Sequence, residues 1–177
     1  MIDILMPRGN EAELIALAEK LGFRELVLLY EHKKPSSPTP SSVKVKIRQA
    51  VLVSTLNEIN GINQEIMIVA PAQREFFESK RVGFVIDAES DPGRDLFFQR
   101  RAGLDEAMCK LAKEKTTTLV FDLRLLRDNA ALGRMMQNAA LCRKYKLKTV
   151  VATFAFSPLQ MRAPKDLEGF SRMLKLV

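Results

Sequence analysis

Histidine is nearly missing from this chain: there is one in 177 residues, His32, within a proline-rich segment. Metal-dependent phosphoesterases and nucleases commonly hold their ions with several histidines and with Asp or Glu at strand ends. A site with several histidines is therefore excluded by counting. A Mg²⁺ site made of carboxylates alone stays open as an alternative. Its candidate ligands lie in or next to predicted strands: Asp3, Glu31, Asp87 and Asp122.

Other sequence signatures are missing as well. No GxGxxG follows the first predicted strand, and the chain has no GxxxxGK[ST] phosphate loop and no GxSxG nucleophile turn. Tryptophan is absent and aromatic residues make up 7%, too few for a platform that stacks single-stranded bases. These absences argue against nucleotide-dependent enzymes and the usual nucleophilic hydrolases.

Cysteine and long apolar runs are also scarce. The two cysteines, Cys109 and Cys142, both fall in helix-like apolar patterns. We therefore expect reduced core thiols and a cytoplasmic location. No apolar run approaches the 20 or so residues of a membrane-spanning helix, and the first residues lack the pattern of a secretory signal.

Positive charge, in contrast, is concentrated at one end of the chain. The last 54 residues hold eleven Lys and Arg against three acids, an excess of +8, while the whole chain carries +7. A one-sided charge of this size favours a polyanionic partner. With so few aromatics, contact with the phosphates of a folded RNA is the first expectation.

Short apolar runs alternate with longer amphipathic ones, and most of the short runs are continuously apolar, which is typical of parallel strands covered by helices. Strands are predicted at about 2–6, 25–30, 48–54, 65–70, 82–87, 117–123 and 148–154. We predict an α/β fold in one domain over residues 1–177: a distorted TIM-like (β/α) barrel of about seven strands. An open doubly wound sheet is the alternative.

Local signals locate several helices. Asn10 with Glu13 predicts a capping box ahead of the first helix, which Gly22 ends. Pro71 is expected to begin a helix running to about residue 80. The longest helix is predicted at Asn129–Tyr145, with Arg134 and Asn138 on an outward face. Its expected apolar face consists of Leu132, Met135, Met136, Ala139 and Cys142.

Four stretches resemble the ribonuclease P protein family of archaea and eukaryotes that includes the third archaeal protein component. They are GLDEAMCKLAKE (103–114), LVFDLRLL (119–126), MMQNAALCRKYKLKTVVATFA (135–155) and MRAPKDLEGFSRMLKL (161–176). The Arg-x-Pro followed by Asp in the last stretch is similar to the family's signature. The chain departs from the family pattern at Glu106, where the family has histidine.

The resemblance implies a barrel related to the polymerase-and-histidinol-phosphatase (PHP) phosphoesterases that has lost their metal-binding histidines. It also implies a role in removing the 5′ leader of precursor tRNA, with hydrolysis by the catalytic RNA using Mg²⁺ and no cofactor bound by the protein. The implied partners are ribonuclease P RNA, precursor tRNA and a second small protein subunit. An archaeal-type member without a catalytic site of its own is expected.

The basic residues supply the candidate RNA contacts. Residues just past strand ends gather on one rim of a barrel, which predicts that Arg124, Arg127 and Arg162 lie together. By resemblance, Arg162 and Asp166 match the family's Arg-x-Pro and Asp element, and Lys144 matches its basic helix end. The full set of expected RNA contacts is Arg100, Arg101, Arg124, Arg127, Arg134, Lys144, Arg162 and Lys165. A self-sufficient metal-dependent phosphoesterase is the alternative function.

Overall fold

Seven parallel strands form the centre of the molecule. The computed structural model describes residues 1–31, 44–90 and 103–176. The strands follow one another around a single sheet in chain order. They are β1 (Ile2–Leu5), β2 (Glu25–Glu31), β3 (Lys46–Leu52), β4 (Met67–Pro71), β5 (Val82–Ile86), β6 (Thr118–Asp122) and β7 (Thr149–Ala152).

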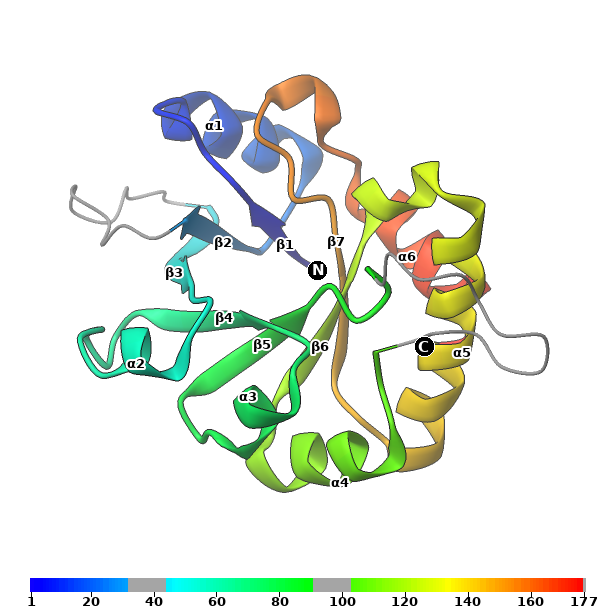
Figure 1. Cartoon of the computed structure of the whole chain (residues 1–177). Helices are drawn as coiled ribbons and strands as arrows, with labels where there is room; N and C mark the ends of the chain where they lie inside the picture. Colours follow the sequence, from blue (N-terminus) through cyan, green and yellow to red (C-terminus); the bar gives the residue numbers. More distant parts are fainter. Residues whose placement is uncertain (32–43, 91–102, 177) are drawn as a thin grey trace.

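The first and last strands meet, so that the sheet becomes a nearly closed barrel (Figure 1). The segment that continues β7 joins β1 through two backbone hydrogen bonds, Phe154 N to Ile4 O and Met6 N to Ala155 O, each 2.9 Å long. This seam has a single parallel bridge, Leu5 with Ala155. Closure removes the exposed strand edges that an open sheet would leave.

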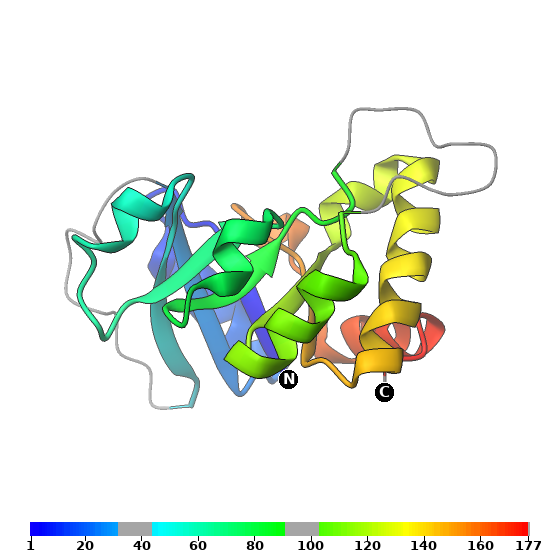
Figure 2. The same ribbon diagram turned by 60° about the horizontal axis from the view of Figure 1, so that its bottom comes forward.

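Helices surround the barrel on the outside. They are α1 (Glu11–Leu21), α2 (Leu56–Ile59), α3 (Arg74–Glu78), α4 (Glu106–Lys115), the 3₁₀ turn η1 (Leu123–Arg127), α5 (Asn129–Tyr145), the 3₁₀ turn η2 (Pro158–Gln160) and α6 (Pro164–Met173). Figure 2 shows α4 and α5 side by side. The end of α6 lies against the end of α5, where Arg143 Nη1 donates to Leu174 O at 2.7 Å. None of the helices in the described ranges is long and apolar enough to cross a bilayer.

Apolar side chains fill two layers. Alternate residues of the strands, such as Ile4, Val120 and Phe154, pack against one another inside the barrel. The intervening residues, such as Leu5 and Phe121, face outward into a larger core beneath the helices. Strands buried on both faces explain the continuous apolar runs of the sequence. Cys109 and Cys142 are buried free thiols, as expected, and burial raises the pKa of Cys142 to about 12.

The predicted architecture is confirmed, with all seven strands within two residues or so of their expected starts and the barrel in place of the open sheet. Two local predictions are wrong. Asn10 precedes α1 without capping it, because its Oδ1 accepts from Arg8 N and its Nδ2 donates to Phe156 O. Pro71 ends β4, and α3 begins only at Arg74. Gly22 ends α1 with φ of 84°, as predicted.

The orientation of α5 also differs from the prediction. Its bounds are those expected, but Arg134 and Asn138 point inward at 3% and 0% exposure. Met136, assigned to the apolar face, is 55% exposed. The physical reason is a buried acid on the barrel, Glu89, which the inward polar side chains of α5 contact. Hydrophobic periodicity alone could not reveal a polar contact within the core.

Candidate functional site

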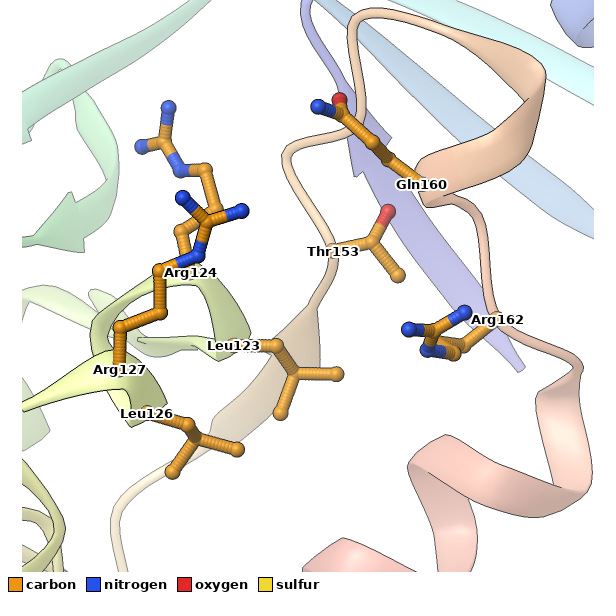
Figure 3. A pocket seen from close by; sticks show the side chains of 7 residues that line it. All are labelled: Leu123, Arg124, Leu126, Arg127, Thr153, Gln160 and Arg162. Carbon is orange, nitrogen blue, oxygen red and sulfur yellow. The ribbon is translucent and has the colours of Figure 1, made fainter.

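Three arginines line one pocket at the carboxyl-terminal edge of the barrel. It opens between η1, which follows β6, and the segment that follows β7, and has a volume of about 340 Å³. Figure 3 shows its lining, which consists of Leu123, Arg124, Leu126, Arg127, Thr153, Gln160 and Arg162. No carboxylate is among these lining residues. The predicted gathering of Arg124, Arg127 and Arg162 on one face is thus observed, because parallel strands end at the same rim.

Arg124 is fixed in place by the strand that precedes it. Its Nε and Nη2 donate to Asp122 Oδ2 at 2.9 and 2.7 Å, and its guanidinium carbon lies 4.8 Å from the centre of the Phe154 ring. Asp122 also accepts from Arg124 N at 2.7 Å, which begins η1. The carboxylate of Asp122 is 1% exposed, whereas the Arg124 side chain is 42% exposed. A buried acid therefore holds an accessible cation at the pocket wall.

Arg127 and Arg162 bring positive charge to either side of the pocket. Both are exposed, and within the described part of the chain neither forms an ion pair. Arg127 ends η1 directly before Asp128, whose side chain accepts from Ala130 N and caps α5. Arg162 lies just before α6, where Asp166 Oδ2 accepts from Ala163 N at 3.2 Å. Asp166 thus fixes the backbone next to Arg162, which gives the Arg-x-Pro and Asp element a structural purpose.

Two neutral polar residues complete the pocket. Gln160 Oε1 accepts from Phe156 N at 3.0 Å, which leaves its amide N–H groups as donors. Thr153 lies on the continuation of β7 and is 4% exposed. Its N and Oγ1 donate to Asp3 Oδ1 and Oδ2 at 2.7 and 2.8 Å. Sequence reasoning missed both residues, since Thr153 lies within an apolar run and Gln160 within no motif.

Asp3 is a buried acid directly behind Thr153. It is 0% exposed, and its Oδ1 also accepts from Ile4 N at 2.9 Å. Burial raises its pKa from 3.8 to about 7, against the opposing effect of the hydrogen bonds from Thr153 and Ile4. A group with this pKa exchanges its proton near neutral pH.

The other predicted RNA contacts are scattered. Arg100 and Arg101 lie outside the described residues. Lys165 is exposed in the first turn of α6, close in sequence to Arg162. Lys144 is exposed at the opposite end of α5 from η1, and a 17-residue helix is about 25 Å long. Arg134 is buried, so the expectation that it lies on an outward face is wrong.

Arg134 belongs to a buried polar cluster beneath α5. Arg134 Nη1 donates to Glu89 O at 3.2 Å, and Asn138 Nδ2 donates to Glu89 Oε1 at 2.7 Å. Glu89 is 2% exposed, and burial raises its pKa from 4.5 to about 7. The backbone carbonyl and side chain of Glu89 therefore explain the inward polar face of α5.

The four carboxylates proposed as metal ligands do not form a common site. Asp3 is turned toward the seam and bound by Thr153, and Glu31 is exposed at the end of β2. Asp122 binds the guanidinium of Arg124. The pKa of the nearby Asp87 is raised, first by burial and second by the negative charge of Asp122. Across residues 1–31, 44–90 and 103–176, no three His, Cys, Asp or Glu side chains are placed to hold an ion together. The donor set of the alternative site thus does not fit a metal.

Comparison with known proteins gives matches of fold. No protein-family model matches the chain, and no curated protein matches it. One chain in the cryo-EM structure of archaeal ribonuclease P with mature tRNA superposes with a TM-score of 0.77 at 18% identity, covering 99% of this chain and 83% of that one. The barrel is similar to that of an archaeal ribonuclease P component. The expected resemblance is therefore confirmed in the fold.

A second match is to the fold of a phosphatase. Histidinol phosphate phosphatase of Lactococcus lactis, in complex with zinc, L-histidinol and phosphate, superposes with a TM-score of 0.63 at 10% identity. The match covers 99% of this chain and 92% of the phosphatase. The predicted barrel is thus similar in fold to that of this phosphatase.

Proposed function

We propose that this chain is a protein subunit of ribonuclease P that binds the catalytic RNA and assists removal of the 5′ leader from precursor tRNA. The observation that carries the proposal is the similarity of the whole chain to a component of archaeal ribonuclease P. The three-arginine pocket, which has no carboxylate among its described lining residues, supports it. In this proposal the RNA performs hydrolysis with Mg²⁺, the protein binds no cofactor of its own, and the complex acts in the cytoplasm.

The proposed contribution of the protein is electrostatic. Arginines that bind phosphates release the counterions of the RNA, which lets the catalytic RNA and precursor tRNA approach at lower Mg²⁺. Arg124, Arg127 and Arg162 are proposed as the central contacts, together with Lys165 in the first turn of α6. A wider RNA footprint stays a prediction. It would include Lys144 and, outside the described residues, Arg100 and Arg101. A second small protein subunit is proposed to dock on the outer helices.

Reconstitution of the complex tests this function. Cleavage of precursor tRNA by a ribonuclease P RNA is measured at limiting Mg²⁺, with and without this chain and a candidate partner subunit. We expect the chain to restore cleavage, and we expect the triple variant Arg124→Ala, Arg127→Ala, Arg162→Ala to lose most of that effect.

A matched triple variant at the other end of the barrel serves as the control. Lys113 and Lys115 end α4 just before β6 begins, and Lys20 lies in the last turn of α1. Their replacement by Ala removes the same charge and should leave cleavage unchanged.

The phosphoesterase alternative makes a different prediction. The isolated chain would hydrolyse a generic phosphoester with Mg²⁺ or Mn²⁺, and Asp87→Asn would abolish this activity. That result would establish the phosphoesterase alternative.

A further inference from the structure

The three-arginine pocket places guanidinium groups from η1 and from the segment before α6 around one hollow. Its volume of about 340 Å³ is bounded by guanidinium groups on both sides, with Thr153 at its base and Gln160 at its rim (Figure 3). A phosphate or sulfate group offers several acceptor oxygens, and arginine forks with neutral donors match that geometry.

The Thr153 hydroxyl has one proton, and Asp3 decides where that proton goes. A hydroxyl donates one hydrogen bond and accepts two. While Asp3 is ionised it can only accept, so Thr153 Oγ1 donates to Asp3 Oδ2 over 2.8 Å and has no proton left for a ligand. When Asp3 carries a proton on Oδ2, the same contact reverses and Asp3 donates to Thr153 Oγ1. Thr153 Oγ1 then keeps its own proton available for a ligand in the pocket that this residue lines.

We propose that the pocket binds the oxyanion of a phosphate group together with a proton on Asp3, so that Thr153 donates to the ligand only in the protonated state. The proton moves from solvent to Asp3 Oδ2, and no other group changes its charge. This inference rests on the proposed function in treating the pocket as part of the RNA-binding surface, and adds a ligand class and a regulating acid. The pKa of Asp3, raised by burial to about 7, places the transition near neutral pH.

Within the described residues, the acids near Arg124 are Asp122, Asp87 and Glu89, and burial also raises the pKa of Asp87 and Glu89, so Asp3→Asn is needed to test Asp3 apart from them. The arginines stay protonated throughout the neutral range, and Asp122 binds Arg124. On β2, Glu25 pairs with Arg48, and in α6 Asp166 accepts from the Ala163 backbone. Burial raises the pKa of Asp3 and the hydrogen bonds from Thr153 and Ile4 lower it, with no charged side chain among these causes. Asp3 is therefore the acid to which we assign the linkage.

Sulfate binding to the full chain tests the linkage directly. Sulfate is a tetrahedral oxyanion that does not titrate near neutral pH, so a pH effect on its affinity must come from the protein. We expect affinity, measured by calorimetry, to be highest below about pH 7 and to fall about tenfold by about pH 8, as expected for losing a hydrogen bond to a charged group. By reciprocity, bound sulfate should raise the pKa of Asp3, followed through its carboxyl ¹³C resonance.

Two isosteric variants separate this proposal from a structural role of the same residues. Asp3→Asn presents an N–H where protonated Asp3 has its O–H, so it should bind sulfate as tightly at about pH 8 as the native chain does at about pH 6. Thr153→Val should bind weakly at both pH values, whereas Thr153→Ser should keep the pH dependence. Thermal unfolding confirms that each variant is folded. Sulfate affinity that is independent of pH, or a pH dependence kept in Asp3→Asn, would overturn the proposal.

A comparison of ligands identifies the source of the phosphate and keeps the two proposals apart. A short RNA supplies phosphodiesters, and a phosphomonoester supplies a free phosphate group. RNA binding that shows the Asp3-dependent pH effect assigns the pocket to the RNA backbone, while an effect confined to the monoester assigns it to a small phosphorylated ligand. RNA binding through the arginines without sulfate binding overturns the oxyanion pocket and leaves the ribonuclease P proposal intact. Sulfate binding without restored cleavage of precursor tRNA overturns the ribonuclease P proposal and leaves the oxyanion pocket intact.

Discussion

At the scale of single residues, buried carboxylates determine how the surface cations are held. Asp122 fixes Arg124, and Asp3 fixes Thr153. Glu89 likewise binds the inward polar side chains of α5, but not every polar atom of this cluster is paired within the described residues. Glu89 Oε2 and Asn138 Oδ1 are buried atoms for which the described residues provide no hydrogen-bond partner. An orphaned buried acceptor lowers stability, and more so when it is charged.

The Glu89→Gln substitution should stabilise the protein at high pH. Burial raises the pKa of Glu89 from 4.5 to about 7, so the folded chain holds the proton more tightly than the unfolded chain. The stability cost of ionised Glu89 is therefore absent below the unfolded pKa, grows as pH rises between the two values and is complete above the folded pKa. Glutamine stays neutral and can donate to Asn138 Oδ1.

We expect Glu89→Gln to raise the free energy of unfolding at about pH 8 by on the order of 2 kcal/mol, with little gain at about pH 5. Denaturant unfolding at both pH values measures this. The exposed Glu65→Gln is the matched control, for which we expect no comparable change. An equal effect of Glu89→Gln at both pH values would contradict the role of its charge.

At the scale of secondary structure, a close contact joins the start of α4 to the end of β5. Gly103 N donates to Ala88 O at 2.6 Å, two residues before the Asp105 side chain accepts from Met108 N and caps α4. A Cβ on Gly103 would lie 2.7 Å from Ala88 O and 3.2 Å from Ala88 Cα. Backbone atoms cannot yield as a flexible side chain can, so this approach requires glycine.

Two glycine substitutions with opposite expected signs test this contact. Gly103→Ala should lower the free energy of unfolding by about 1–3 kcal/mol through steric overlap. Gly169→Ala, within α6, places its methyl group in open space and should raise stability by about 0.5–1 kcal/mol, because alanine favours the helix. Thermal or denaturant unfolding of both variants gives the comparison. A neutral Gly103→Ala would show that the end of β5 moves freely relative to α4.

At the scale of the whole molecule, the barrel separates its positive charge into two ends. Strands β6 and β7 end at the rim with Arg124, Arg127 and Arg162, while α4 returns to the opposite end with Lys113 and Lys115. The seam between β1 and the continuation of β7 brings Asp3 beneath Thr153, from residues 150 positions apart. Only the closed barrel thus joins the amino-terminal acid to the carboxyl-terminal arginines.

The salt dependence of RNA binding should distinguish the two ends. Arg162→Ala should weaken RNA binding and reduce the slope of log K against log salt by about one unit, the contribution of one phosphate contact. Lys113→Ala removes an equal charge from the opposite end and should leave the slope unchanged. Affinity titrations at several salt concentrations measure both. An equal loss of slope in the two variants would indicate diffuse attraction to net charge in place of a defined rim.

The sequence by itself determined the strand order and the rim on which Arg124, Arg127 and Arg162 gather. Continuous apolar runs specify parallel strands buried on both faces, and a barrel of such strands has all their carboxyl ends at one edge. Local hydrogen-bond choices were less predictable: Asn10 bonds to Arg8 and Phe156 in place of capping α1.

Tertiary structure alone decided which polar residues face inward. Arg134 and Asn138 fall outside the apolar face of α5 by periodicity, yet they turn inward because Glu89, far away in sequence, lies opposite them. Thr153 becomes a pocket residue and Asp3 an acid with a raised pKa only when the seam closes and excludes water. Periodicity records the average preference of side chains for water, whereas burial of a polar group depends on a specific partner that only the folded chain supplies.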